Sequence, residues 1–302
     1  MYVYPKESDG ARSPCVKVSS PVALRHENLS RGPLFSTLPG RRRDARWTHR
    51  LLAYAAVLMA WDPAPTLGDR FASALTCLGD LFPSRRRPGH TYRGFADALV
   101  RVSPQLVPAV QEHLRAAVDQ LGHPLREGWH AFAVDGSRID CPRTRANEAA
   151  FGTASRDGTA PQMYLTILWQ MGTGLPYAWR IGQARSSERD HLRQMLEHLP
   201  PQALLVADAG FTGYELMQTL QASGCFFLIR VGANVELLRQ LGTYTREGRD
   251  TVYLWPKKHR PGLPLVLRLI RIKKVYLLTN VLSPTELSKD TAGKLYRARW
   301  GV

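Results

Sequence analysis

The stretch from Ala203 to Gly213, ALLVADAGFTG, constrains the fold more than any other part of the sequence. Its apolar first half has the length of a buried strand and ends at Asp208, after which the chain turns through Gly210. Thr212 and Glu215 have the spacing of a capping box, which predicts a helix directly after the turn. A strand, an acidic turn and a helix form half of an α/β unit. Because ligands gather at the carboxyl ends of strands in such sheets, Asp208 is a candidate functional residue.

A second carboxylate follows a second apolar segment. Residues 131–134, AFAV, form an expected strand that leads directly into Asp135. Two strands that each end in aspartate allow two carboxylates to converge on one site, whereas a single aspartate there is more often a turn residue or a helix cap. The pair therefore carries the functional interpretation. Asp140 is a rival for the role of Asp135, and Asp157 and Asp190 are assigned to a loop and a helix cap.

The charge balance indicates a polyanionic partner. Lys and Arg total 41 against 25 for Asp and Glu, which gives a formal net charge of +16 and a pI near 10.1. Nucleic acid or an anionic membrane surface would suit this excess. The longest apolar run, Leu51–Trp61, has about half the length of a membrane-spanning helix, and the N-terminal sequence lacks a signal-peptide pattern. Nucleic acid is therefore favoured, and no membrane association is expected.

The cysteines predict the redox environment. They are isolated from one another, with no CxxC pair and no histidine at metal-ligand spacing: Cys15, Cys77, Cys141 and Cys225. This pattern is typical of a protein from a reducing cytoplasm and predicts no structural zinc site.

Composition divides the first part of the chain in two. Residues 1–45 are rich in Pro, Ser, Gly and Arg without sustained periodicity, which predicts a basic flexible tail. In residues 46–122, apolar residues recur at three- and four-residue spacing, which predicts a small helical domain. Ser103 followed by Pro104 predicts the start of a separate last helix in this domain.

Three consecutive arginines stand in a connector of the helical domain: Arg85, Arg86 and Arg87. The excess positive charge of the whole chain favours contact between these arginines and DNA phosphates, so the helical domain is a candidate DNA-binding domain. The alternative is a helical bundle with a solvated cationic loop.

Residues 128–302 combine strand and helix patterns. Apolar segments of strand length surround helical patterns, and the turn at 172–174 predicts an antiparallel hairpin. Short strands separated by basic residues predict a β-rich insertion at about residues 233–274. Ser283-Pro284-Thr285-Glu286 predicts the start of the last helix. The expected fold class is α/β, with a mixed sheet that contains the hairpin.

Four motifs, in this order, resemble a known family. AVDGS at 133–137, VADAGF at 206–211, VYLLTN at 275–280 and YRARW at 296–300 are similar to DDE transposases of the insertion-sequence-four type. In that family the first Asp follows a strand in a V-D-G-S/T context and the second lies in D-x-G-F/Y. The third acid belongs to a Y-x2-R-x3-E-x6-K signature. The resemblance covers roughly residues 129–302.

The resemblance implies roles for individual residues. Asp135 and Asp208 match the first two catalytic carboxylates, which also bind metal, whereas Tyr296 and Arg299 match residues that hold DNA phosphates. The family spacing places the third glutamate immediately after Val302, beyond the printed sequence. We therefore expect a catalytic domain that is incomplete at its C-terminal end and that cleaves DNA poorly by itself.

The resemblance also implies a ribonuclease H-like fold and two-metal chemistry. Two Mg²⁺ or Mn²⁺ ions, which prefer oxygen ligands, would support phosphodiester hydrolysis and strand transfer, with the second ion held weakly in the absence of the third acid. The implied partner is double-stranded DNA at transposon ends and at the target, bound by a homodimer. The alternative is a non-catalytic DNA-binding fragment that competes with the full-length transposase.

Overall fold

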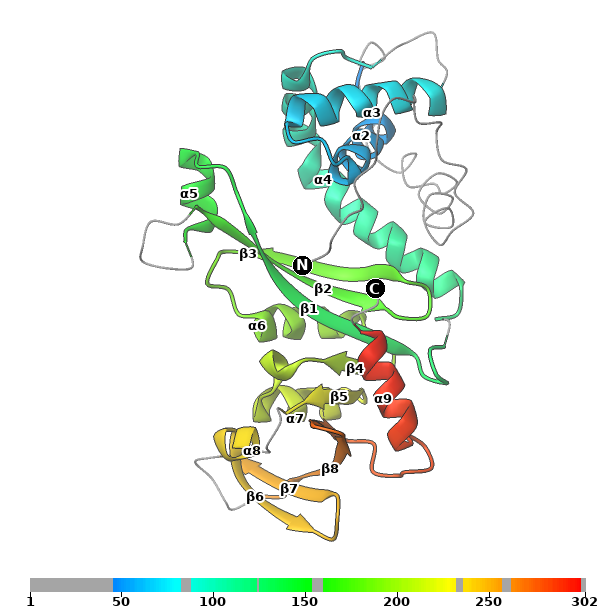
Figure 1. The fold of residues 1–302 in the computed structure, drawn as a ribbon, viewed down its shortest axis with the longest axis vertical. Coiled ribbons are helices and arrows are strands. Elements are labelled where there is room, and N and C mark those ends of the chain that lie inside the picture. The colour runs from blue at the N-terminus through cyan, green and yellow to red at the C-terminus, as the bar shows by residue number, and fades with distance from the viewer. Residues whose placement is uncertain are drawn as a thin grey trace. The chain divides into compact units, whose positions relative to one another are not determined.

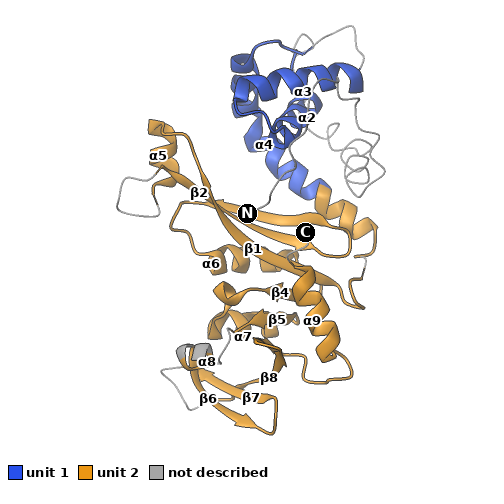
Figure 2. Ribbon diagram, viewed as in Figure 1, with its two compact units in different colours: residues 1–113 blue, residues 114–302 orange. Residues whose placement is uncertain are grey.

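The computed structural model describes residues 46–82, 88–123, 125–153, 160–231, 236–256 and 262–299. The chain divides into two compact units, residues 1–113 and residues 114–302 (Figure 2). The basic tail predicted at residues 1–45 lies outside the described residues, as do Arg85, Arg86 and Arg87.

The first unit is helical in its described part. Its helices are α2 (His49–Trp61), α3 (Leu67–Leu81) and α4 (Tyr92–Gln120), the last of which continues into the second unit. Thr48 and Thr66 cap α2 and α3, since each side chain accepts a hydrogen bond from a backbone N–H of the first turn. The helices enclose a core that contains Trp47, Phe71 and Phe95.

Helix α4 differs from the sequence prediction, because it continues through Pro104 where a separate helix was expected to begin. The hydroxyl of Ser103 donates a hydrogen bond to the Leu99 carbonyl at 2.7 Å. Val102 and Leu106, on either side of the proline, are buried in the same core. Burial of one continuous apolar face therefore outweighs the backbone hydrogen bond that proline removes.

The second unit is organised around a nine-stranded sheet with the order β3-β2-β1-β4-β5-β9-β8-β7-β6 (Figure 1). Strands β1, β4 and β5 are parallel neighbours, whereas the remaining pairs are antiparallel. The predicted α/β fold class, with a mixed sheet that contains an antiparallel hairpin, is confirmed. The strands are β1 (Ala131–Asp140), β2 (Gln162–Gln170), β3 (Leu175–Gly182), β4 (Leu204–Ala207), β5 (Phe226–Arg230), β6 (Gly242–Glu247), β7 (Thr251–Pro256), β8 (Leu265–Ile272) and β9 (Val275–Thr279).

Helices cover both faces of this sheet. On one face, α6 (Glu188–Met195) and α7 (Tyr214–Ala222) pack through buried residues such as Leu192 and Leu216. On the other face, α9 (Lys289–Ala298) packs through Leu295 (Figure 1). The shorter helices are α5 (Arg145–Phe151), η2 (Leu196–His198), η3 (Ala209–Phe211) and α8 (Glu236–Leu241). Within the described ranges, none of the helices has the length and apolar character needed to cross a bilayer.

Strand β1 is longer than the sequence predicts. Its antiparallel pairing with β2 continues to Asp140, whereas its parallel pairing with β4 ends at Ala133 opposite Val206. Asp135 therefore lies inside a strand and not directly after one. The prediction ended the strand at its first polar residue, but pairing with the long partner β2 keeps the polar segment extended.

The start of α7 is also displaced from its prediction. Gly213 precedes the helix and makes no side-chain cap, so the capping box expected from Thr212 and Glu215 is wrong. The Thr212 hydroxyl instead donates a hydrogen bond to the Ala209 carbonyl at 2.6 Å. Thr212 thus closes the short turn of η3, and α7 begins without its help.

The last helix starts later than predicted. The Ser283 side chain accepts hydrogen bonds from the backbone N–H groups of Thr285 and Glu286. These bonds stabilise a turn and not the first turn of a helix. Helix α9 begins at Lys289, where the Ser288 side chain accepts a hydrogen bond from the Thr291 N–H at 3.0 Å. Both serines have the local chemistry of a helix cap, and only the second initiates a helix.

Candidate active site

Alternation along three neighbouring strands places charged residues on the face of the sheet that α9 covers. On β1, β4 and β5, alternate residues pack in the core beneath α9, and the last of these are Ala133, Val206 and Leu228. Because side chains alternate between faces, the residues two positions further point to the same side. They are Asp135, Asp208 and Arg230. We call Asp135, Asp208, Arg230, Tyr296 and Arg299 the acid–arginine site.

Asp208 joins the end of β4 to the turn that follows it. Its Oδ1 accepts a hydrogen bond from the Ala209 N–H at 2.7 Å, so it caps η3. Its side chain is 30% exposed, compared with 59% for Asp135. Asp208 therefore does cap a helix, as expected for an aspartate after a strand. Its second carboxylate oxygen, Oδ2, remains available to the site.

Arg299 follows α9 and contacts both aspartates. Its Nη1 lies 3.7 Å from Asp135 Oδ1 and its Nη2 lies 3.4 Å from Asp208 Oδ2. The Arg299 side chain is only 1% exposed, so a desolvated cation lies against two carboxylates from different strands. The two aspartates that the sequence singled out are thus within reach of one guanidinium group.

Tyr296 approaches Asp208 from the same helix. Its hydroxyl donates a hydrogen bond to Asp208 Oδ1 at 3.3 Å, and the Arg299 guanidinium lies 5.6 Å from the centre of its ring. Burial raises the pKa of Tyr296, and the neighbouring Asp208 carboxylate raises it further, against the opposing effect of Arg299 and Arg230. The hydroxyl therefore stays protonated at neutral pH and acts as a donor.

Arg230 is a member of the site that the sequence analysis missed. It is the last residue of β5, and its Nη1 lies 3.7 Å from Asp208 Oδ1. The available signal was the spacing of Phe226, Leu228 and Arg230, which places the arginine on the same face as the buried residues before it. An arginine at the end of an apolar strand is therefore a candidate site residue in the same way as an aspartate at that position.

The donor set suits a hard divalent cation. Asp135 and Asp208 present carboxylate oxygens to one shared region, and oxygen is the ligand that Mg²⁺ and Mn²⁺ prefer. Among the residues that the structure describes, no group of three or more His, Cys, Asp or Glu side chains is placed to hold a metal ion. The described site therefore offers two acidic ligands, with Arg230 and Arg299 balancing their charge.

The other candidates lie elsewhere. Asp140 ends β1 on the opposite face from Asp135 by alternation, and its Oδ1 accepts a hydrogen bond from Gln162 Nε2 at 2.8 Å. Asp190 is in the first turn of α6 and pairs with Arg193 at 2.6 Å. Asp157 lies outside the described residues.

Comparison with known proteins gives matches that agree with these motifs. The model of the transposase DDE domain family matches residues 130–302, which is more than half of the chain. The chain is 25% identical over 193 residues to the transposase InsG for insertion sequence element IS4 from Escherichia coli (strain K12). That match covers 60% of this chain and 44% of InsG, so the chain spans less than half the length of that relative.

A solved structure is also similar at low identity. The cryo-EM structure of the piggyBac transposase synaptic complex with hairpin DNA matches with a TM-score of 0.39 and 13% identity. The match covers 95% of this chain and 68% of the other.

The family match and the similarity to InsG confirm the resemblance to DDE transposases of the insertion-sequence-four type, without use of the piggyBac structure. The chain belongs to the transposase DDE domain family.

Proposed function

We propose that this protein acts on the DNA ends of an insertion sequence by metal-dependent phosphodiester hydrolysis followed by strand transfer. The observation that carries the proposal is the convergence of Asp135 and Asp208, from adjacent parallel strands, on the single guanidinium of Arg299. In the first step, water attacks the phosphorus and the bond to the 3′ oxygen breaks, which leaves a 3′-hydroxyl. In the second step, that oxygen attacks a target phosphorus and displaces the target's own 3′ oxygen.

Asp135 and Asp208 are the proposed metal ligands and catalytic residues. When bound, two divalent cations would activate the attacking oxygen and stabilise the leaving one. The remaining residues of the acid–arginine site bind and orient DNA. Arg299 and Arg230 supply planar guanidinium groups suited to phosphate oxygens, and the neutral Tyr296 hydroxyl supplies a further hydrogen-bond donor.

DNA binding outside the site is assigned to basic residues of the helical part. The chain carries a formal net charge of +16, and Arg85, Arg86 and Arg87 add three adjacent cations to the domain of residues 46–122. We propose that this domain binds DNA through phosphate contacts, with residues 128–302 as the catalytic domain and residues 233–274 as its β-rich insertion. A fall in DNA affinity as salt rises would accompany such contacts.

The assembly and the compartment are proposals of the same kind. Two DNA ends must be processed together in transposition, which supports a homodimer on double-stranded DNA. Within the described residues, Cys141 and Cys225 are free thiols, which supports the reducing cytoplasm. Sedimentation of the protein with and without a duplex of one transposon end would test the dimer.

A second candidate function is DNA binding without cleavage. The described residues bring two carboxylates and not three to the site, and Arg299 contacts both. With two acidic ligands the second cation would be held weakly. On this alternative, residues 1–302 by themselves occupy transposon ends and compete with a full-length transposase.

Plasmid nicking separates the two candidates. A supercoiled plasmid that carries the ends of the insertion sequence is incubated with the protein and Mg²⁺ or Mn²⁺, and with EDTA as control. Cation-dependent nicking that Asp208→Asn abolishes, with DNA affinity retained, supports the catalytic proposal. Salt-sensitive DNA binding without nicking by the unchanged protein supports the binding alternative.

A further inference from the structure

The two aspartates are each followed by a glycine that lies against the same carboxylate. A Cβ atom on Gly136, next to Asp135, would lie 2.9 Å from Glu188 Oε2 and 2.7 Å from the Tyr164 hydroxyl. A Cβ atom on Gly210, two residues after Asp208, would collide with Glu188 Oε1. The carboxylate of Glu188 therefore contacts the backbone of both acidic segments, from the face opposite α9.

The sheet itself does not fix the spacing of the two aspartates. Parallel pairing between β1 and β4 ends at Ala133 opposite Val206, two residues before each aspartate. Within the described strands, no residue pair of the β1–β4 ladder lies beyond that point. Glu188 contacts both segments in this region, which is where the ladder no longer constrains their separation.

Glu188 is itself held in place. It lies in the first turn of α6, which Ser187 caps, and its Oε2 accepts a hydrogen bond from the Tyr164 hydroxyl at 2.8 Å. Burial and, after it, the hydrogen bond to Glu188 together raise the pKa of Tyr164 to about 12, so this donor keeps its proton. At the end of β3, Gly182 similarly admits Ser186 and His191, so the start of α6 fits closely against the sheet.

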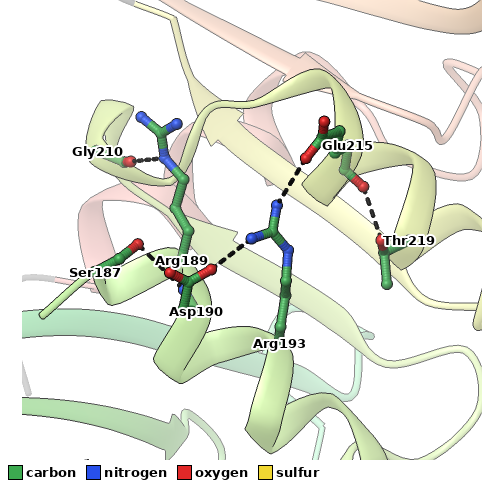
Figure 3. Close-up of polar contacts among 7 residues, drawn as sticks. All are labelled: Ser187, Arg189, Asp190, Arg193, Gly210, Glu215 and Thr219. Carbon is green, nitrogen blue, oxygen red and sulfur yellow. Dashed lines mark hydrogen bonds and ion pairs between the residues drawn. The ribbon is translucent and has the colours of Figure 1, made fainter. Parts of the chain in front are cut away.

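Neighbouring residues of α6 also hold the turn that follows Asp208. Arg189 Nε donates a hydrogen bond to the Gly210 carbonyl at 2.8 Å (Figure 3). One turn further along α6, Arg193 lies 2.6 Å from Asp190 and 3.5 Å from Glu215 of α7 (Figure 3). The backbone around Gly210 is thus contacted both by the Glu188 carboxylate and by the Arg189 side chain.

We propose that Glu188 is a positioning residue, which sets the separation of Asp135 and Asp208 by bridging the two glycines behind them. Among the described residues, Glu188 does not form a metal-ligand group with the two aspartates, and it approaches their segments from the opposite face of the sheet. The proposal rests on the proposed cation site at Asp135 and Asp208, and it predicts that changes at Glu188 alter cation affinity through geometry.

Mn²⁺ affinity of the full chain, measured by electron paramagnetic resonance of the free ion, tests the proposal without requiring DNA cleavage. Partners that orient metal ligands typically contribute about 10- to 100-fold to affinity. We expect a loss in this range for Glu188→Ala. Glu188→Gln keeps the shape and the hydrogen-bond acceptor, so we expect a change of no more than about threefold. Glu197→Ala, an exposed glutamate just after α6, is the matched control.

A double-mutant cycle tests the contact itself. Gly210→Ala introduces the methyl group that meets Glu188, so we expect weaker Mn²⁺ binding. In the Glu188→Ala background the obstruction is gone, so the same change costs much less. Equal effects of Gly210→Ala in both backgrounds overturn the proposal, because the contact then plays no part.

The remaining outcomes are also decisive. A folded Glu188→Ala variant that binds Mn²⁺ as tightly as the unchanged protein overturns the proposal. If Glu188→Ala does not fold, Tyr164→Phe replaces it, since it removes only the hydroxyl that holds Glu188, and unchanged affinity again overturns the idea. Asp135→Asn and Asp208→Asn test the proposed cation site separately from the proposed role of Glu188. If neither weakens Mn²⁺ binding, the proposed cation site is wrong, whatever Glu188 does.

Discussion

The two faces of the central sheet carry different kinds of polar residue. Beneath α9, the segments of β1, β4 and β5 place Asp135, Asp208 and Arg230 on one face. On the face of α6 and α7, Gly136 lies next to Asp135, and the Glu188 carboxylate that contacts it comes from the helix. Because neighbouring residues on a strand point to opposite faces, a shift of one residue in register would exchange these roles. The acidic residues and the glycines that contact Glu188 thus lie within the same short segments.

An arginine that bridges two carboxylates occurs on each face, and the two differ in burial. Arg299 contacts Asp135 and Asp208 with a side chain that is 1% exposed. Arg193 contacts Asp190 and Glu215 with a side chain that is 36% exposed. Because each arginine contacts two carboxylates, a comparison of the two distinguishes the effect of burial from the effect of charge pairing itself.

The largest expected effect is on DNA nicking, and it should differ between Asp135 and Asp140, two aspartates of one strand. Asp135→Asn should reduce cation-dependent nicking by roughly 10³-fold, since a bound metal contributes several kcal/mol. Asp140→Asn, in the same strand on the other face, should change it by less than about twofold, because Asp140 bonds only to Gln162 in the described contacts. Where the chain does not nick DNA, Mn²⁺ affinity gives the same comparison. Equal losses in the two variants would contradict the division between faces.

Core truncations on the two faces should cost similar amounts of stability. Leu295 of α9 and Leu216 of α7 are both fully buried. Replacing either by Ala should lower the free energy of unfolding by about 2–5 kcal/mol, through lost burial and the cavity left behind. Urea denaturation measures both. A cost below about 1 kcal/mol for Leu295→Ala would show that α9 packs loosely and that the acid–arginine site is not rigidly held.

Replacing Arg299 or Arg193 should cost less stability than these core truncations, and the two costs should differ. Arg299→Gln should lower the free energy of unfolding by roughly 1–3 kcal/mol, because a desolvated contact to two carboxylates is lost while both aspartates keep access to water. Arg193→Gln should cost no more than about 1 kcal/mol, as expected for an exposed pair. Denaturation at low and high salt sharpens the comparison, since only the exposed contacts should weaken with salt.

Tyr164 gives the smallest predicted effect, which depends on pH. Its pKa in the folded protein is raised from 10.0 to about 12, so the unfolded chain loses this proton first as pH rises. The associated stabilisation is therefore complete below pH 10 and is lost as pH rises through about 12. Melting temperatures of the unchanged protein and of Tyr164→Phe should converge over this range. A constant difference across the range would show that the Tyr164 hydroxyl does not report the contact with Glu188.

Sequence patterns predicted the parts of this structure where local and tertiary preferences agree. The apolar run before Asp208 and the hairpin of β2 and β3 were predicted because their patterning and turn residues point the same way. The predicted start of the last helix was wrong because Ser283 and Ser288 are both suitable caps. Only the packing of Leu287 and Leu295, which is not visible locally, favours the second.

The site shows the same division. Asp135 and Asp208 were found from their position at the ends of apolar segments, and Tyr296 and Arg299 from family spacing. Arg230 was missed because no motif contains it, although strand alternation would have placed it. Glu188 could not have been found, because its importance depends on two glycines that are distant in sequence and meet only in the folded sheet.

The acid–arginine site is composed of segments that are far apart along the chain, and this has a consequence for folding. The contact between Asp135 and Arg299 closes a long loop that includes β2 to β9, and such contacts form late because their entropic cost is high. The two aspartates therefore meet a common cation only after the centre of the sheet and α9 have docked. A partly folded chain carries the same excess of positive charge but has no assembled acid pair. If the proposed function holds, DNA binding and DNA cleavage therefore become possible at different stages of folding.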